Sequence, residues 1–366
     1  MTPTERYQVA LREGFKPDAA QARAAAELTR LHEALLAQPE PKAEGLFRKL
    51  RGLLGEERPA SVRGLYLWGG VGRGKTWLMN AFHESLPFPN KLREHFHTFM
   101  RRIHEELKSL PNTVDPLDVV AERLSWQTRI INLDEFHVAD IADAMLLGRL
   151  LGALFERGIT VVTTSNTQPD NLYKGGLQRA RFLPAIELIK TNMSVFELDS
   201  QVDYRLRALE QAEIYHAPLD DQAERSLREC FDALLPENVH EGEVLDVLGR
   251  PIKTQRTADG IAWFDFSELC DTARAVIDFI ELARSYHTVL IAKIPKMGRV
   301  EDDNKAHRLI QLVDEFYDRN VNLIVSAEGQ PAELYPNGRL REPFQRTRSR
   351  LEEMRTREYL SRLHLP

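Results

Sequence analysis

Short apolar runs and longer segments of helical spacing follow one another along most of this chain. The apolar runs are typical of buried strands, and they lie at residues 65–68, 129–133, 159–165, 194–198 and 289–294. Between them are amphipathic segments with apolar residues three or four positions apart, such as residues 139–157. Strands that alternate with helices in this way pair in parallel through right-handed crossovers. The pattern therefore predicts an α/β fold with a parallel sheet.

A glycine-rich turn follows the first apolar run, where the sequence reads LYLWGGVGRGKT over residues 65–76. Gly69, Gly74, Lys75 and Thr76 occupy the fixed positions of the P-loop motif. Glycines let backbone N–H groups surround a phosphate, and the following helix directs its positive dipole end at the same anion. We expect Lys75 to contact the β- and γ-phosphates of ATP and Thr76 to bind Mg²⁺. The expected nucleotide-binding set also contains Gly70, Val71, Gly72, Arg73 and Trp77. The alternative is a plain glycine turn between a strand and a helix.

A second strand ends in two adjacent carboxylates. Residues 129–135 read RIINLDE, which matches the Walker B arrangement of P-loop ATPases. We expect Asp134 to hold the Mg²⁺ shell and Glu135 to act as the base that activates water. A carboxylate placed beside the metal aspartate favours hydrolysis over transfer to another acceptor. Asn132 departs from the pattern, because such strands are usually apolar at this position.

Polar residues after the next strand predict further catalytic groups. Asn166 follows the strand 159–165, at the position where AAA+ ATPases hold the attacking water (sensor 1). Arg179 and Arg181 follow some fifteen residues later, where AAA+ proteins present an arginine finger to a neighbouring subunit. We favour Arg181 slightly over Arg179. The alternatives are an asparagine in a turn and solvated loop arginines.

Composition narrows the class of protein. The chain has 366 residues, 43% apolar and 28% charged, with a net charge of -6 that argues against a protein that mainly coats nucleic acid. Cys230 and Cys270 are far apart, which indicates neither a disulfide framework nor a zinc site. No apolar run approaches the roughly 18 residues of a membrane span, and the N-terminus resembles neither a signal nor a transit peptide. We therefore expect a cytoplasmic protein without a transmembrane segment.

Four segments are expected along the chain. Residues 1–60 form a helical arm with helices at 18–38 and 42–54, and residues 61–213 form the P-loop ATPase core. Residues 214–265 add a helix and a hairpin that turns at Asp259-Gly260. Residues 266–366 are expected to extend the same sheet with further α/β units and to end in a basic helix.

An internal repeat is suggested by the gapless alignment of residues 300–327 on residues 138–165. Lys293 and Lys296 stand near the strand end of the later copy in place of paired acids, so this copy is not expected to hold Mg²⁺ by itself. Chance similarity between two α/β units is the alternative.

Other polar residues have both a structural and a functional interpretation. Asp18 and Gln21 are expected to cap a helix and lie at the surface, the alternative being contact with adenine. His95 and His97 are expected to lie on one face of a strand and pack there, the alternative being a metal pair. Arg346, Arg348 and Arg350 are expected to form ion pairs on the C-terminal helix, the alternative being a sensor 2 role at the nucleotide.

Five blocks together resemble the ZapE family of bacterial cell-division ATPases and its mitochondrial relatives. They are GLYLWGGVGRGKTWLMNAF, HFHTFMRRIHEEL, LDEFHVADIADAMLL, NLYKGGLQRARFLPAI with DYRLR, and RTRSRLEEM. The resemblance implies an AAA+-like ATPase that associates with the FtsZ division ring in bacteria. It implies Lys75 and Thr76 as nucleotide and Mg²⁺ ligands, Asp134 and Glu135 as Walker B, and Asn166 as the sensor. The family usually has a hydrophobic residue or Cys at the position of Asn132, and mainstream AAA+ lids carry a sensor 2 motif that is not visible here.

Three functions follow from these observations. The first is an ATPase that regulates cell division by acting on FtsZ polymers, recruited from the cytoplasm to the division site, and a finger in trans would make it a homo-oligomer. The second is a nucleic-acid-associated AAA+ ATPase such as a helicase loader, which the acidic net charge disfavours. The third is a module that uses ATP only as a switch, which Glu135 disfavours because a switch gains nothing from a placed base.

Overall fold

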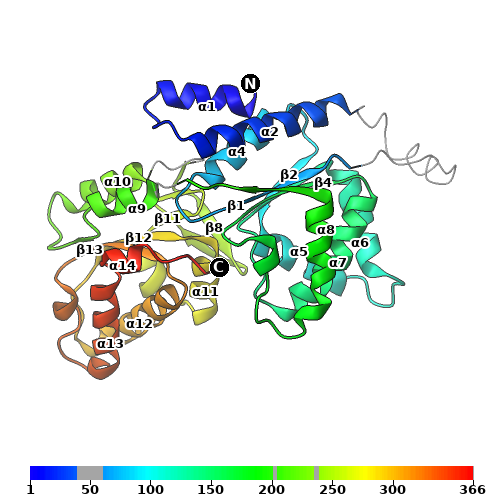
Figure 1. Cartoon of the computed structure of the whole chain (residues 1–366). Helices are drawn as coiled ribbons and strands as arrows, with labels where there is room; N and C mark the ends of the chain where they lie inside the picture. Colours follow the sequence, from blue (N-terminus) through cyan, green and yellow to red (C-terminus); the bar gives the residue numbers. More distant parts are fainter. Residues whose placement is uncertain (39–60, 201–203, 235–238, 366) are drawn as a thin grey trace. The chain divides into compact units, whose positions relative to one another are not determined.

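A computed structural model describes residues 1–38, 61–200, 204–234 and 239–365 of the chain (Figure 1). It divides into two compact units, Met1–Val202 and Asp203–Pro366. The helix expected at 42–54 lies outside the described residues. Within the described ranges no helix is long and apolar enough to cross a membrane.

The first unit is built on a five-stranded parallel sheet in the order β2-β3-β4-β1-β5. Its strands are β1 (Gly64–Trp68), β2 (Lys91–His95), β3 (Ile130–Asp134), β4 (Thr160–Ser165) and β5 (Met193–Glu197). The glycine-rich turn follows β1, which lies between β4 and β5. The paired carboxylates stand at the end of β3, on the other side of β4. Because all five strands are parallel, their carboxyl ends meet at one edge of the sheet.

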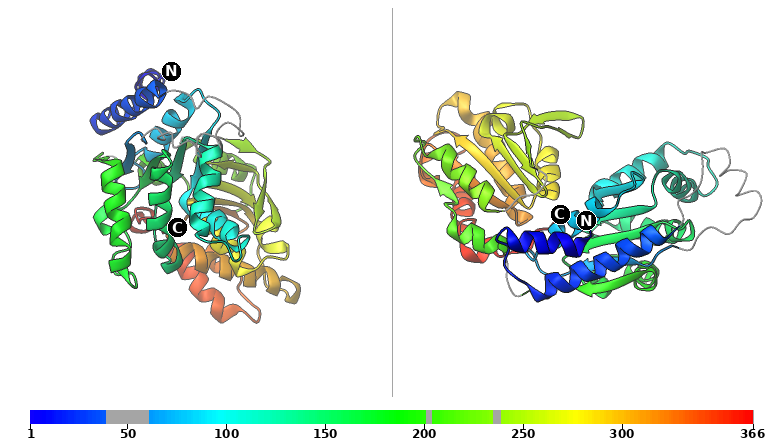
Figure 2. Two further views of the ribbon diagram at one scale, coloured as in Figure 1. Left: turned by 90° about the vertical axis from the view of Figure 1, so that its right-hand side faces the viewer. Right: turned by 90° about the horizontal axis from the view of Figure 1, so that it is seen from above.

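Helices cover both faces of this sheet, as the two views of Figure 2 show. Leu65 and Leu67 of β1 pack in one core with α1 (Pro3–Arg12), α2 (Ala19–Ala37) and α4 (Lys75–Ser85). Tyr66 points to the opposite face and its core. The helices of that face are α5 (Phe96–Lys108), α6 (Pro116–Gln127), α7 (Ile141–Glu156) and α8 (Leu183–Asn192). Helices on both faces of one parallel sheet form a three-layer arrangement, which confirms the expected α/β fold.

The second unit has a sheet of its own, in the order β6-β13-β12-β11-β10-β7. Its strands are β6 (Tyr215–His216), β7 (His240–Glu241), β10 (Arg256–Ala258), β11 (Ile261–Asp265), β12 (Thr288–Ile294) and β13 (Asn322–Ala327). A separate two-stranded hairpin joins β8 (Val244–Val247) and β9 (Arg250–Lys253). The helices are α9 (Tyr204–Gln211), α10 (Ala223–Ala233), α11 (Val276–Ser285), α12 (Asp303–Asp318), α13 (Arg341–Glu353) and α14 (Arg357–Leu360).

The prediction that these strands extend the first sheet is therefore wrong. Residues 214–265 are not an insertion, because they supply β6, β10 and β11 of the second sheet, with the hairpin turn at Asp259-Gly260 as expected. The later units bring their own first strand, β6, which lies at one edge of the second sheet and pairs with β13. The elements of the second unit form a hydrophobic core on each face of their own sheet, so their strands do not have to pair with an edge of the first sheet. The structure divides the chain at residue 202 instead of residue 213.

The internal repeat is present in the structure. Each of three elements of the first unit recurs exactly 162 residues later: α7 as α12, β4 as β13, and the 3₁₀ turn Pro169–Asn171 as Pro331–Glu333. The parallel strands β6-β13-β12-β11 repeat the order of β1-β4-β3-β2. The second unit thus repeats the element spacing and the strand order of the P-loop core.

Candidate functional site

Glycines shape the loop between β1 and α4. Gly72 and Gly74 have φ of 68° and 86°, in the left-handed region that favours glycine. A Cβ on Gly69 would lie 2.6 Å from the Leu198 carbonyl oxygen, so a side chain is excluded there. Gly74, the N-cap residue of α4, makes no side-chain capping hydrogen bond, which leaves the first N–H groups of the helix available to an anion. These features fit the phosphates of a nucleotide.

Lys75 lies at the start of α4 with its ammonium group inside the loop. Its Nζ donates to the carbonyl oxygens of Gly69 at 2.8 Å and Gly70 at 2.6 Å, and only 9% of the residue is exposed. Thr76 follows in the first turn of the helix and is partly exposed. Val71 is likewise partly exposed within the loop. The cation expected to contact the phosphates is therefore held at the loop.

The N-terminal segment packs against this loop. Trp77 contacts Tyr7 and Phe15, with ring centroids 6.1 and 5.3 Å apart. Its expected role at the nucleotide stays a prediction. Gln21 is buried, and its Nε2 donates to the Arg73 carbonyl oxygen at 2.9 Å. The arm is thereby tied to the P-loop backbone.

Asp18 has the capping role that we expected. Its Oδ1 accepts from the N–H groups of Ala20 and Gln21, and its Oδ2 accepts from Ser200 Oγ at 2.6 Å. Gln21 is not at the surface, however, because its amide is needed to hold the loop.

The two carboxylates of the β3 end have different surroundings. Asp134 is buried; its Oδ2 accepts from Arg93 Nε at 2.7 Å and its Oδ1 accepts from Thr164 Oγ1 at 3.1 Å. Glu135 has a φ of 53°, and its N–H donates to the same Thr164 hydroxyl at 3.1 Å. Its Oε2 lies 3.9 Å from His95 Nδ1. Sequence reasoning did not identify Arg93, Thr164 or His95 as partners, because all three are distant in the sequence.

Asn132 fills a polar position inside the sheet. It is fully buried, and its Nδ2 donates to His83 Nδ1 of α4 at 2.6 Å. Burial, aided by the positive charges of Lys91 and Arg93, lowers the pKa of His83 to about 4. The ring is therefore neutral near pH 7 and can accept this bond. The polar residue that departed from the family pattern joins the Walker B strand to the P-loop helix.

Asn166 follows β4 and is partly exposed. Since β4 pairs in parallel with β3, Asn166 lies at the same sheet edge as Asp134 and Glu135. Ser165 Oγ donates to the Phe136 carbonyl oxygen at 2.7 Å, which joins the loops that follow the two strands. This position fits the expected sensor, whose role stays a prediction.

The two candidate finger residues differ in their contacts. Both belong to a 3₁₀ turn, Arg179–Arg181, that precedes α8. Arg179 Nη2 donates to the Asp170 carbonyl oxygen at 2.6 Å, whereas Arg181 is exposed. The arrangement favours Arg181 for contact with another chain, although the finger role itself stays a prediction.

His95 and His97 do not share a strand face, so this prediction is wrong. β2 ends at His95 and α5 begins at Phe96, which places His97 in the first helical turn. The two ring centroids are 6.0 Å apart. In the part of the chain that the structure describes, no group of three or more His, Cys, Asp or Glu side chains is arranged to hold a metal ion.

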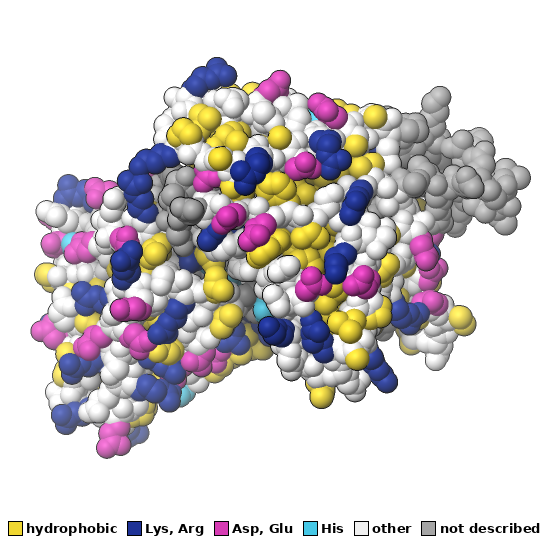
Figure 3. Space-filling model, viewed as in Figure 1, with side chains coloured by type: hydrophobic (Ala, Val, Ile, Leu, Met, Phe, Trp, Pro, Cys, Tyr) yellow, Lys and Arg dark blue, Asp and Glu magenta, His cyan; other side chains and the backbone are white. Residues whose placement is uncertain are grey.

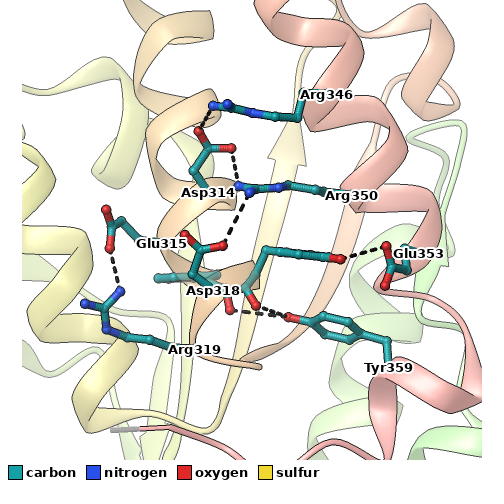
Figure 4. Close-up of polar contacts among 10 residues, drawn as sticks. Asp314, Glu315, Asp318, Arg319, Arg346, Arg350, Glu353 and Tyr359 are labelled. Carbon is teal, nitrogen blue, oxygen red and sulfur yellow. Dashed lines mark hydrogen bonds and ion pairs between the residues drawn. The ribbon is translucent and has the colours of Figure 1, made fainter. Parts of the chain in front are cut away.

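The C-terminal arginines form ion pairs within the second unit (Figure 4). Arg346 and Arg350 of α13 both contact Asp314 of α12, and Arg350 Nη2 also lies 3.3 Å from Asp318 Oδ1. Arg348 pairs with Glu352 of its own helix at 2.9 Å. The expected salt-bridged helix is confirmed, and these contacts lend no support to a sensor 2 role.

The second unit lacks the chemistry of the first at equivalent positions. Lys293 has the left-handed backbone of Glu135, with a φ of 64°, and its N–H donates to Ser326 Oγ at 3.0 Å. Because Lys293 corresponds to Glu135, the preceding residue, Ala292, corresponds to Asp134. Lys293 Nζ lies 3.3 Å from Asp265 Oδ1, so an ion pair occupies the position of the candidate base. The helix α10 follows β6 as α4 follows β1. It begins with Ala223 and Glu224, where α4 begins with Lys75 and Thr76.

Comparison with known proteins adds to this geometry. The family model described as AFG1-like ATPase matches residues 1–363. The chain is 46% identical to "Cell division protein ZapE" of Escherichia coli (strain K12) over 371 aligned positions, which cover 100% of this chain and 99% of the relative. It is 36% identical to "Lactation elevated protein 1 homolog B" of Danio rerio, over 81% of this chain and 62% of that protein.

Solved structures resemble the chain more distantly. The crystal structure of DnaI is 20% identical with a TM-score of 0.34, and the match covers 51% of this chain and 89% of that chain. A likeness at this level carries no conclusion about function.

Proposed function

This chain belongs to the AFG1-like ATPase family and is an ATP hydrolase, and on this premise we propose that it turns over ATP at the P-loop of the first unit. In this proposal Lys75 contacts the β- and γ-phosphates, Thr76 and Asp134 hold Mg²⁺, and Glu135 is the base. The observation that carries the proposal is the meeting of these four residues at the carboxyl edge of one parallel sheet.

The residues present fit this chemistry. The uncapped start of α4 and the glycine loop suit a polyphosphate, and Mg²⁺ supplies neutralisation of its charge when bound. Glu135 accepts the proton of a water whose oxygen forms a bond to the γ-phosphorus, and the bond from that phosphorus to the bridging oxygen breaks to release ADP. Thr164 fixes the backbone of Glu135 and one oxygen of Asp134 at once.

For the cellular role we propose regulation of cell division through FtsZ polymers. Support comes from the full-length similarity to a protein named for cell division. We further propose that the protein acts in the cytoplasm, at the division site, as a homo-oligomer. Arg181 of one subunit then contacts the nucleotide site of its neighbour. The exposed position of Arg181 is consistent with it.

Sedimentation of FtsZ polymers tests the partner. FtsZ assembled with GTP is pelleted with wild-type protein, with Glu135→Gln and with Lys75→Ala, each with and without ATP. ATP should change the pelleted fraction or the co-sedimentation of wild-type protein, Glu135→Gln should remain on the polymer, and Lys75→Ala should not respond to ATP. If wild-type protein hydrolyses ATP yet neither binds FtsZ nor changes its polymers, the partner assignment is wrong.

A nucleic-acid partner has less support. On the face seen in Figure 3, acidic and basic side chains are interspersed over the second unit, and the net charge of the chain is -6. If single-stranded DNA stimulates ATP turnover and FtsZ has no effect, the nucleic-acid partner would be favoured over FtsZ.

A further inference from the structure

Arg93 is a cation that the P-loop and Walker B motifs do not account for. It lies in β2, directly opposite Asn132 of β3 in the parallel register. Because side chains alternate along a strand, Arg93 shares a sheet face with Asn132 and Asp134. Asn80 and His83 of α4 contact this face, so the cluster lies between the Walker B strand and the P-loop helix.

The guanidinium group is bound to the expected metal ligand. Arg93 Nε donates to Asp134 Oδ2 at 2.7 Å, and another nitrogen of the group donates to Asn80 Oδ1. The two side chains of the ion pair are 15% and 5% exposed. Two opposite charges shielded from water in this way attract each other more strongly than a pair at the surface.

Both oxygens of Asp134 are therefore engaged by protein groups, one with a cation and the other with the Thr164 hydroxyl. A carboxylate has about four acceptor positions, so a water of a metal shell can still be accepted. Its negative charge, however, is already compensated by Arg93. Since the attraction between Asp134 and Mg²⁺ depends on that charge, the two cations oppose each other.

The second unit offers an internal comparison. At the equivalent register Trp263 lies opposite Leu290, and Ala292 stands where Asp134 would be. The unit that lacks the carboxylate thus also lacks the cation. Trp263, Leu290 and Ala292, which stand at the positions of Arg93, Asn132 and Asp134, are all buried. The arginine and the aspartate are present together or absent together.

We propose that Arg93 is the built-in counter-ion of Asp134, with which Mg²⁺ has to compete, and that it lowers the Mg²⁺ affinity of the nucleotide site. The inference rests on the proposed function, because it requires the metal to bind near Asp134. Arg93 is in this view a positioning residue that sets the Mg²⁺ concentration at which nucleotide binds.

Binding without turnover tests the proposal. A fluorescent ATP analogue is titrated onto Glu135→Gln protein at a series of free Mg²⁺ concentrations, with and without Arg93→Gln. Arg93→Gln should lower the half-saturating Mg²⁺ concentration about tenfold, within the range usual for coupled binding. Arg93→Lys keeps the charge and should give a smaller shift. Arg93→Met is a second uncharged variant should the glutamine variant not fold. Binding of Mn²⁺, followed by electron paramagnetic resonance, should show the same order.

Two controls separate this effect from loss of any ion pair. Arg102→Gln breaks a pair with Glu94, at 3.1 Å, and should leave the half-saturating Mg²⁺ concentration unchanged. In an Asp134→Asn background, Arg93→Gln should have no effect on it. An equal or higher half-saturating Mg²⁺ concentration in Arg93→Gln and Arg93→Met overturns the proposal. If nucleotide binding depends on neither Mg²⁺ nor Lys75 even with Arg93 intact, the proposed function fails instead.

Discussion

Tyr66 and Tyr215 make the same hydrogen bond in two different sheets. Tyr66 OH donates to the Thr167 carbonyl oxygen at 2.8 Å, and Tyr215 OH donates to the Gly329 carbonyl oxygen at 2.7 Å. The two acceptors are 162 residues apart, the interval that also separates α7 from α12. Each tyrosine ties the strand β1 or β6 to the loop that follows the neighbouring strand, so both units have this tie although Ala292 and Lys293 stand in place of Asp134 and Glu135.

Replacing these two tyrosines separates stability from catalysis. Tyr66→Phe and Tyr215→Phe should each lower the free energy of unfolding by about 1 kcal/mol, the usual contribution of one such hydrogen bond. Tyr66→Phe should also slow ATP turnover, because Thr167 follows the candidate sensor Asn166. Tyr215→Phe should leave turnover unchanged. Denaturant unfolding and steady-state ATPase rates check both, and equal turnover in the two variants would argue against a sensor role for the loop.

Lys75→Ala should abolish nucleotide binding by the whole chain. The reason is that Lys75 supplies the cation of the P-loop, while the second unit has Ala223 at the start of the corresponding helix. Calorimetric titration with a non-hydrolysable ATP analogue should give one site per chain for wild-type protein and none for the variant. Lys253→Ala, at an exposed position of β9, serves as the control. Residual binding by Lys75→Ala would indicate a second nucleotide site.

Glu135→Gln should retain ATP and lose turnover. Loss of a general base typically slows a reaction 10²–10⁴-fold, and the amide keeps the shape of the side chain. Single-turnover hydrolysis and analogue binding measured on the same preparation separate the two effects. Glu187→Gln on α8, whose side chain is 71% exposed, should behave as wild type. Hydrolysis by Glu135→Gln at the wild-type rate would exclude the assigned base.

Mixed subunits test whether Arg181 acts in trans. Arg181→Ala subunits keep an intact nucleotide site, and Lys75→Ala subunits keep an intact arginine. Each alone should be inactive, and their mixture should regain part of the ATPase rate. Arg179→Ala, which removes a bond to the Asp170 carbonyl oxygen, should reduce activity less. Full activity of Arg181→Ala alone would remove the finger from the mechanism.

The second unit should lose stability as the pH rises above neutrality. His216 lies between Glu213 and Asp220, with its ring nitrogens 2.7 Å and 2.9 Å from their oxygens, and these hydrogen bonds raise its pKa. A raised pKa in the folded state gives stabilisation that is complete below about pH 6.5, where the unfolded histidine is protonated too. It is lost as the pH rises through the folded-state pKa. The stability difference between wild type and His216→Asn should therefore shrink from pH 6 to pH 9.

Denaturant unfolding at each pH, together with an NMR titration of the imidazole, measures this effect. His240→Asn, at an exposed position of β7, is the matched control. A difference that does not change with pH would show that His216 acts only by packing.

The P-loop and Walker B groups could be predicted because their signals are local. Gly69, Gly74 and Lys75 occupy fixed spacings beside a readable strand and helix, and Asp134 and Glu135 directly end another strand. The membership of the later strands in a second sheet could not be predicted, since an apolar run such as β12 reads the same in either sheet. That choice depends on which neighbouring strand offers free hydrogen-bonding groups.

The partners of the site residues were likewise outside the reach of sequence. Arg93 is 41 residues from Asp134, and His83 is 49 residues from Asn132, so only the parallel pairing brings them together. Asn132 itself was a signal, because a polar residue in a buried strand needs a partner. The histidine pair was misassigned because the strand ends between His95 and His97, and boundaries are the least reliable part of a prediction.

The loop that follows β6 bears on how the enzyme responds to its substrate. Residues 217–222, APLDDQ, contain no glycine, so we do not expect the loop after β6 to bind a second triphosphate. Binding of an ATP analogue to isolated chains should then follow a hyperbolic curve. A sigmoidal binding curve, with a Hill coefficient above one, would report communication between chains, and diluting the protein should abolish it.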